Sequence, residues 1–174
     1  AEMQDETSSG GTSENVSGAS SGTASLSSSS SEQLCVVSWV GKSAVTINEI
    51  MPGNVNWYDD RGKDPGWVEL YNSSSEPVAL NGLALVESKA RPRKWVAGND
   101  TIPANGYRII FASDRGLANP PEGVDSDSLH YRAHTDWKLE DKGGTLFLVS
   151  ENCGILDSAS YPALEAGISW GKTS

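Results

Sequence analysis

The alternation of apolar and polar positions locates the centre of the chain between residues 66 and 88. Residues 66–72 follow a period of two, with Val68 and Leu70 on one face and Trp67, Glu69 and Tyr71 on the other. After a Ser-rich turn, an apolar run over 77–88 is interrupted by Asn81-Gly82. Both residue types tolerate positive φ, so this dipeptide predicts a tight turn between two strands, with Gly82 in a structural role.

Further apolar runs predict short strands on both sides of this pair. They cover residues 34–40, 45–50, 95–96, 107–112, 137–139, 145–149, 155–161 and 167–170. In the run 45–50, we expect Val45, Ile47 and Glu49 on one face. No window of 11 residues shows a helical repeat, and no strand–helix–strand rhythm is present. The pattern therefore predicts an all-β, antiparallel β-sandwich.

The first 33 residues differ from the rest in composition. Residues 1–32 contain twelve Ser, four Gly and three Thr, together with five acidic residues and no basic or aromatic residue. Such a segment cannot bury enough apolar surface to offset its chain entropy. We therefore expect a disordered Ser/Gly-rich tether over 1–33 and one folded domain over 34–174.

The charge balance narrows the classes of partner. The chain carries a formal net charge of −10, and the tether contributes half of it. A mildly acidic domain on an acidic tether is a poor general binder of nucleic acid.

No apolar run approaches the ~20 residues that span a bilayer. The first residues show no leader, which fits an exported protein after leader removal or a partial chain.

Several short motifs in order resemble the lamin tail domain as it occurs in bacterial secreted proteins. They lie at residues 47–50, 66–72, 78–85, 101–107, 129–139, 144–148, 156–158 and 169–171, so the resemblance covers roughly residues 44–171. Two departures are visible. The family commonly ends in a Pro-Thr-Pro-Gly-like turn, whereas this sequence stops at Ser174 and its closing segment is expected to be missing. The excursion over 113–135 is longer than the family pattern needs.

The resemblance implies an immunoglobulin-like sandwich without family-wide catalytic activity. In bacteria such domains are usually appendages of exported proteins, so we expect an extracellular or cell-surface accessory module. It would bind a protein or a glycan, or act as a spacer within a larger exported protein. The alternatives are a calcium-binding part of an extracellular hydrolase, and a purely structural spacer. The nuclear lamin role is not expected, because no heptad-bearing segment is present.

Two groups of residues could hold a metal ion. Asp59, Asp60 and Asp64 lie on one polar loop and offer oxygen ligands for calcium, although the spacing of a known calcium loop is absent. The alternative is a solvated turn.

His130 and His134, near Asp136 and Glu140, have the spacing of a helical zinc pair, but no helix is expected there. A Ser-His-Asp triad has no supporting nucleophile-elbow motif.

Two glutamates in strand motifs, Glu49 and Glu69, could form a carboxylate pair for acid–base chemistry. We favour a structural role, in which backbone groups or the amides of Asn48 and Asn72 donate hydrogen bonds to them. Trp67 is expected in the core.

Two surfaces could bind a ligand. The basic hairpin tip has Lys89, Arg91, Arg93 and Lys94 beside Trp95, which suits phosphates or acidic glycans, or else protects a strand edge. The loop aromatics Trp57, Tyr58, Tyr131 and Trp137 could stack on sugars or peptides, or could pack inward.

The two cysteines, Cys35 and Cys153, allow one disulfide and no cysteine-based metal site. A bridge would join the first strand of the domain to a late hairpin, and two unpaired thiols are the alternative.

Overall fold

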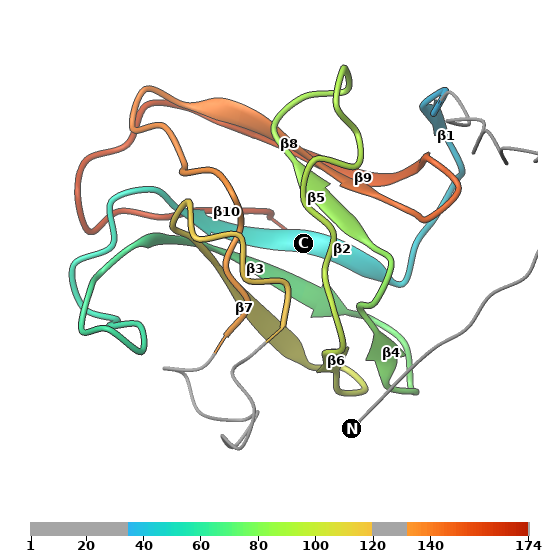
Figure 1. Cartoon of the computed structure of the whole chain (residues 1–174), viewed down its shortest axis with the longest axis horizontal. Helices are drawn as coiled ribbons and strands as arrows, with labels where there is room; N and C mark the ends of the chain where they lie inside the picture. Colours follow the sequence, from blue (N-terminus) through green and yellow to red (C-terminus); the bar gives the residue numbers. More distant parts are fainter. Residues whose placement is uncertain (1–34, 120–131, 174) are drawn as a thin grey trace, which may run out of the picture. The chain divides into compact units, whose positions relative to one another are not determined.

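The computed structural model describes residues 35–119 and 132–173, which belong to one compact unit, Leu34–Ser174. The expected tether, His130 and Tyr131 lie outside the described residues. Two four-stranded sheets pack face to face (Figure 1). Within 35–119 and 132–173 the chain forms no helix, and hence none that could cross a membrane. The all-β sandwich expected from the alternation is confirmed, and its arrangement is immunoglobulin-like.

Each sheet combines strands that are distant in sequence. The first has the order β1 (Ser38–Trp39), β9 (Gly154–Tyr161), β8 (Gly144–Val149) and β5 (Ala84–Val86), with β1 parallel to β9 and the other pairs antiparallel. The second has the order β10 (Trp170–Gly171), β2 (Val45–Met51), β3 (Gly66–Asn72) and β7 (Tyr107–Ala112), all antiparallel. A separate two-stranded ladder pairs β4 (Val78–Ala79) with β6 (Thr101–Ile102).

The main core fills the space between the two sheets, and its largest fully buried members include Ile47, Ile50, Leu70, Leu85, Ile110, Leu146 and Leu148. A second, smaller cluster covers the outer face of β3 and β7, where Trp67, Ile109 and Phe111 pack together. Both faces of β3 and β7 are therefore buried at this end of the sandwich. The chain segments that cover the outer face form the candidate site described below.

The alternation expected in β3 is confirmed, because Val68 and Leu70 enter the main core whereas Trp67 faces outward. The expectation for β2 is wrong beyond Ile47. The register between β2 and β3 shifts between Ile47 and Glu49, so that Ile50 continues the inner face and Glu49 does not. A β-bulge inserts one extra residue and moves every later side chain to the other face.

The predicted turn at 81–82 is present, with the Leu83 N–H donating to the Leu80 carbonyl at 2.9 Å. Only Gly82 has positive φ, at 82°, so the turn needs the glycine but not a left-handed asparagine. The runs 95–96 and 137–139 form isolated bridges, Ala84–Val96 and Ser113–Lys138, and not the expected strands.

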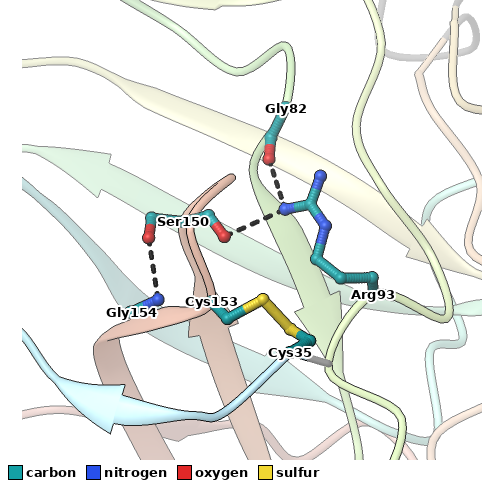
Figure 2. Close-up of a disulfide and its surroundings, with 6 residues drawn as sticks. All are labelled: Cys35, Gly82, Arg93, Ser150, Cys153 and Gly154. Carbon is teal, nitrogen blue, oxygen red and sulfur yellow. Dashed lines mark hydrogen bonds between the residues drawn. A yellow bond between two sulfur atoms is a disulfide. The ribbon is translucent and has the colours of Figure 1, made fainter. Parts of the chain in front are cut away.

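One end of the sandwich is fastened by a disulfide between Cys35 and Cys153, with 5.6 Å between their Cα atoms (Figure 2). It joins the residues before β1 to the hairpin between β8 and β9. Beside it, the Arg93 Nη1 donates to the carbonyls of Gly82 at 2.6 Å and Ser150 at 3.0 Å. Three loops are thus held together by one covalent bond and one half-buried cation.

Candidate functional site

The loop between β2 and β3, residues 54–65, has a backbone fixed by its own side chains. Asn54 is 7% exposed, and its Nδ2 donates to the carbonyls of Trp57 at 2.6 Å and Pro65 at 3.0 Å. Its Oδ1 accepts from the backbone N–H groups of Asn56 and Trp57. One buried amide therefore replaces the strand pairing that the loop lacks.

Asp59 fixes the second half of the same loop. It is 4% exposed, and its Oδ1 accepts from the backbone N–H groups of Arg61 and Lys63, both at 2.9 Å. The Asp59 N–H also donates to the Lys63 carbonyl at 2.7 Å. This turn sets the direction in which the side chains of Arg61 and Lys63 leave the backbone.

A second wall faces this loop and is built from both ends of the long excursion after β7. The Thr135 N–H donates to the Phe111 carbonyl at 2.8 Å, and the His134 N–H donates to the Leu117 carbonyl at 2.7 Å. The Asp114 N–H donates to the Trp137 carbonyl at 3.1 Å. The excursion thus returns to the end of β7 and adds rigid backbone there.

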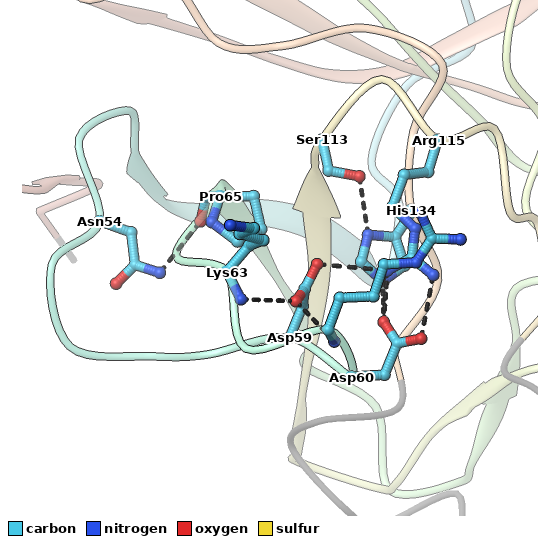
Figure 3. Close-up of polar contacts among 9 residues, drawn as sticks. Asn54, Asp59, Asp60, Lys63, Pro65, Ser113, Arg115 and His134 are labelled. Atoms are coloured by element: carbon cyan, nitrogen blue, oxygen red, sulfur yellow. Dashed lines mark hydrogen bonds and ion pairs between the residues drawn. The ribbon is translucent and has the colours of Figure 1, made fainter.

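Arg115 joins the two walls (Figure 3). Its guanidinium forms a two-pronged ion pair with Asp60, with 3.0 Å between Nη2 and Oδ2, and its Nη1 lies 3.2 Å from the Asp59 Oδ2. The same Nη1 lies 3.1 Å from the Nε2 of His134, whose side chain is 1% exposed. The hydrogen bonds from Arg115 to Asp60, together with the charge of Arg115, hold the pKa of the Asp60 carboxyl below its usual value, against the opposing effect of burial.

The contacts of His134 assign its protonation state. Burial, and secondarily the charge of Arg115, lower the pKa of His134 from 6.5 to about 4, so the ring is neutral at neutral pH. Because a guanidinium has no acceptor, Nε2 must accept the hydrogen bond from Arg115. The proton therefore resides on Nδ1, which lies 2.7 Å from the Ser113 Oγ and donates to it.

This arrangement is unsuited to nucleophilic catalysis. Ser113, His134 and Asp60 are the residue types of a hydrolase triad, and Asp60 Oδ1 lies 3.6 Å from His134 Nε2. In a triad the imidazole must accept the serine proton, whereas here it donates to Ser113 while Arg115 occupies its other nitrogen. A base with a pKa of about 4 also has little affinity for that proton.

The metal-ligating atoms lie in a different grouping from the one expected. Ligand atoms of Asp59, Asp60 and His134 lie within 4.8 Å of one another, whereas Asp64 is exposed and outside this group. Oxygen and imidazole ligands together suit a transition metal better than calcium. In the structure, the Arg115 guanidinium supplies the positive charge between these groups. Calcium binding remains a prediction.

Next to the cluster, an open groove of about 450 Å³ separates the two walls. The loop 54–65 contributes Arg61, Lys63 and Asp64, and the opposite wall contributes Arg115 and Lys138. The remaining lining residues are Pro52, Asp59, Pro65, Gly66, Ala112, Ser113 and Leu139. Cations therefore outnumber carboxylates in this groove, although the whole chain has a net charge of −10.

The aromatic residues of the loop face two ways. Trp57 stacks on the buried Trp67, with 4.9 Å between ring centroids, and remains 37% exposed. Its neighbour Tyr58 is 51% exposed. A hollow of about 160 Å³ lies beside the tryptophan pair. Trp137 is 4% exposed and belongs to the main core, so only part of the predicted aromatic set is accessible.

The basic hairpin tip does not form the expected single patch. Arg93 points inward to backbone carbonyls, and Lys94 pairs with Glu87 at 3.5 Å. Lys89 lies over the ring of Phe147, and Arg91 is left exposed. Arg93 thus holds loops at the disulfide end, and its role in a binding surface remains a prediction.

The groups around Glu49 and Glu69 have structural roles. Glu49 and Glu69 are directly opposite in the β2–β3 ladder, and the Asn48 Nδ2 donates to the Glu69 Oε1 at 2.7 Å. Asn72, expected to donate to a glutamate side chain, instead donates to the backbone carbonyls of Glu76 and Pro103. Burial, with a smaller contribution from Glu49, raises the pKa of the Glu69 carboxyl.

Three residues of the site were not expected from the sequence: Arg115, Ser113 and Lys138. Arg115 lies 55 residues after Asp60, and no local pattern connects the two. The one usable signal was the length of the 113–135 excursion, because long irregular segments in small domains often carry a function.

Comparison with known proteins agrees with the resemblance in the sequence. A family model described as Lamin Tail Domain matches residues 40–163, which span every strand of the fold except β1 and β10. No curated protein matches the chain.

Proposed function

The chain belongs to the lamin tail domain family, and from that premise we propose that it is an exported, non-catalytic accessory module that binds a protein or a glycan. The binding surface is the rigid loop 54–65 together with the groove beside it. The family has an immunoglobulin-like domain, which suits a module without chemistry of its own.

The observation that carries this proposal is the contrast within the loop 54–65. Its buried polar side chains, Asn54 and Asp59, both form hydrogen bonds that fix the loop backbone, whereas Trp57 and Tyr58 between them stay exposed. A rigid loop that presents aromatic side chains loses little entropy when it binds a ligand.

Two further observations support the proposal. The Cys35–Cys153 disulfide suits an oxidising compartment, as expected of an exported protein. Asp59, Asp60 and His134 all contact the Arg115 guanidinium, and His134 is a poor base. This pairing argues against the alternative of a hydrolase.

The experiment is retention of the full chain in native gels that contain polysaccharides, together with binding to immobilised bacterial surface protein. We expect retention by at least one of these ligands, and its loss in Trp57→Ala. Trp39→Ala is the matched control, because Trp39 is 60% exposed and lies on β1, at the disulfide end of the sandwich (Figure 1). Equal loss in both variants would contradict the assignment of the surface.

Catalysis is tested separately with chromogenic esters and phosphate diesters. We expect no turnover above that of Ser113→Ala and His134→Gln. Turnover by the wild-type chain that both variants abolish would restore the hydrolase alternative.

A further inference from the structure

We propose that the groove between the loop 54–65 and the segments around Ser113 and Lys138 is a binding site for an anionic saccharide, with Arg61, Lys63 and Lys138 contacting its acidic groups. This inference rests on the proposed function and names the class of ligand. It places the anion contact in this groove, whereas the sequence suggested the hairpin tip over residues 89–94.

The first argument is the state of the cations. Arg61, Lys63 and Lys138 are exposed and line one groove, and within the described part of the chain no carboxylate pairs with any of them. Asp64 is the only groove carboxylate outside the Arg115 cluster among the described lining residues. Among the described residues, three cations without an ion-pair partner therefore gather in one place on an acidic domain.

The second argument is that their backbone positions are set in advance. The N–H groups of Arg61 and Lys63 are both held by the Asp59 Oδ1. Lys138 lies opposite Ser113 in a β-bridge on the facing wall. Arg115 joins the two walls through Asp59 and Asp60. The backbone positions that carry the cations are thus held on both sides of the groove, which lowers the entropic cost of binding an anion between them.

The third argument concerns which anion fits. A volume of about 450 Å³ is in the range of small-molecule sites. The same loop presents the exposed Trp57 and Tyr58, whose rings can stack on sugar faces. A long duplex polyanion would extend over the acidic remainder of the domain and be repelled there, whereas a saccharide with one acidic group per ring needs only the local cations.

The experiment measures binding of the full chain to oligogalacturonate, which carries carboxylates, and to dextran sulfate, which carries sulfates. Fully methyl-esterified oligogalacturonate is the neutral analogue, and a duplex DNA of random sequence is the competing polyanion. We expect binding to at least one acidic saccharide, weaker binding as salt increases, and at least about tenfold weaker binding to the neutral analogue and to DNA. The carboxylate and sulfate arms identify which acidic group is preferred.

The decisive variant is the triple substitution Arg61→Gln, Lys63→Gln and Lys138→Gln. Its matched control is Lys42→Gln, Arg91→Gln and Lys142→Gln, three exposed cations away from the groove, which changes net charge equally. We expect about tenfold or greater loss of binding in the groove variant and less than about twofold in the control. Thermal unfolding verifies that both variants are folded.

Several outcomes would overturn the inference. Equal losses in the two variants would show that binding follows overall charge. Tighter binding of DNA than of the acidic saccharides would show that the ligand is a nucleic acid. Binding of the neutral analogue as tightly as the acid, lost only in Trp57→Ala, would leave the proposed function standing and remove this inference. No binding to any saccharide would also overturn it, while the protein arm of the proposed function is tested independently.

Discussion

Arg93 and Arg115 fasten two ends of the same sandwich with different chemistry. Arg93 donates to neutral peptide carbonyls beside a disulfide, and no carboxylate pairs with it within the described residues. Arg115 binds two carboxylates and a neutral imidazole in a largely buried cluster. The first end is therefore held by groups that do not titrate, whereas the second depends on the charge states of Asp60 and His134.

The two ends are therefore suited to different tasks. A covalent bond with carbonyl hydrogen bonds is suited to fixing the start of the domain. A cluster in which Arg115 pairs with Asp59 and Asp60, next to a groove lined by cations without ion pairs among the described residues, is suited to presenting those cations.

Removing the disulfide should have the largest effect on stability. The bond closes a loop with a sequence separation of 118, and cross-links of that span stabilise by about 4–5 kcal/mol in the chain-entropy model. We expect Cys35→Ala with Cys153→Ala to lower the free energy of unfolding by about 4 kcal/mol, measured by urea denaturation. Dithiothreitol should destabilise the wild-type chain similarly and leave the double variant unchanged; an effect on both would contradict this account.

Arg115→Met should cost about 3–4 kcal/mol at pH 7, because it leaves two paired carboxylates without their cation. Arg115 lowers the pKa of the Asp60 carboxyl below its ordinary value of 3.8, so this stabilisation is complete above 3.8 and is lost as the pH falls below it, and the deficit of the variant should narrow in that acidic range. Urea denaturation at a series of pH values measures this.

Arg93→Met is the matched comparison for that experiment. We expect a loss of about 2 kcal/mol, from two hydrogen bonds to a charged donor, that stays constant over the same pH range. A pH-dependent deficit at Arg93, or a constant one at Arg115, would remove the distinction between the two ends.

His134 should make folding stability depend on pH in a defined direction. Its pKa is lowered to about 4 in the folded chain from 6.5, so between these values the unfolded chain binds more protons. Its contribution is fully present above pH 6.5 and is lost as the pH falls toward 4, by up to about 3 kcal/mol. In His134→Gln, the drop in stability between pH 7 and pH 4 should be smaller by about this amount.

The smallest effect is expected at the glutamate pair, away from both ends. Glu49 and Glu69 are opposite one another, and the pKa of Glu69 is raised, mainly by burial. Glu69→Gln should keep the acceptor for Asn48 and remove a like-charge contact, raising stability at pH 7 by a few tenths of a kcal/mol. The gain should vanish as the pH falls through the pKa of Glu69. A loss at pH 7 would show that the carboxylate itself is required.

Much of the fold was predictable because it rests on local patterns. The period of two in residues 66–72 gave the faces of β3, and Asn81-Gly82 gave the turn before β5. The bulge after Ile47 was not predictable, because it depends on how β2 pairs with β3. The short runs at 95–96 and 137–139 were predicted as strands, but each pairs with a neighbouring segment at one isolated bridge.

The candidate site was predictable only in its first half. The polar loop with Asp59 and Asp60, and the aromatic residues beside it, stood out in the sequence. The second half depends on Arg115 and His134, which the return of the excursion brings against that loop. Ion pairs between segments 55 residues apart leave no signal in a single sequence. The loop was therefore interpreted as a possible calcium site, because the cation that pairs with it, Arg115, could not be connected with it.

The most direct test of this account is the state of His134, measured by ¹H–¹⁵N NMR on the full chain, with His134→Gln to distinguish it from His130, the other histidine. The account predicts a neutral ring with its proton on Nδ1 and a pKa near 4. A pKa at or above 6.5, or a proton on Nε2, would contradict it. Arg115 would then not hold the ring as described, and Ser113 with His134 would again be a candidate catalytic pair.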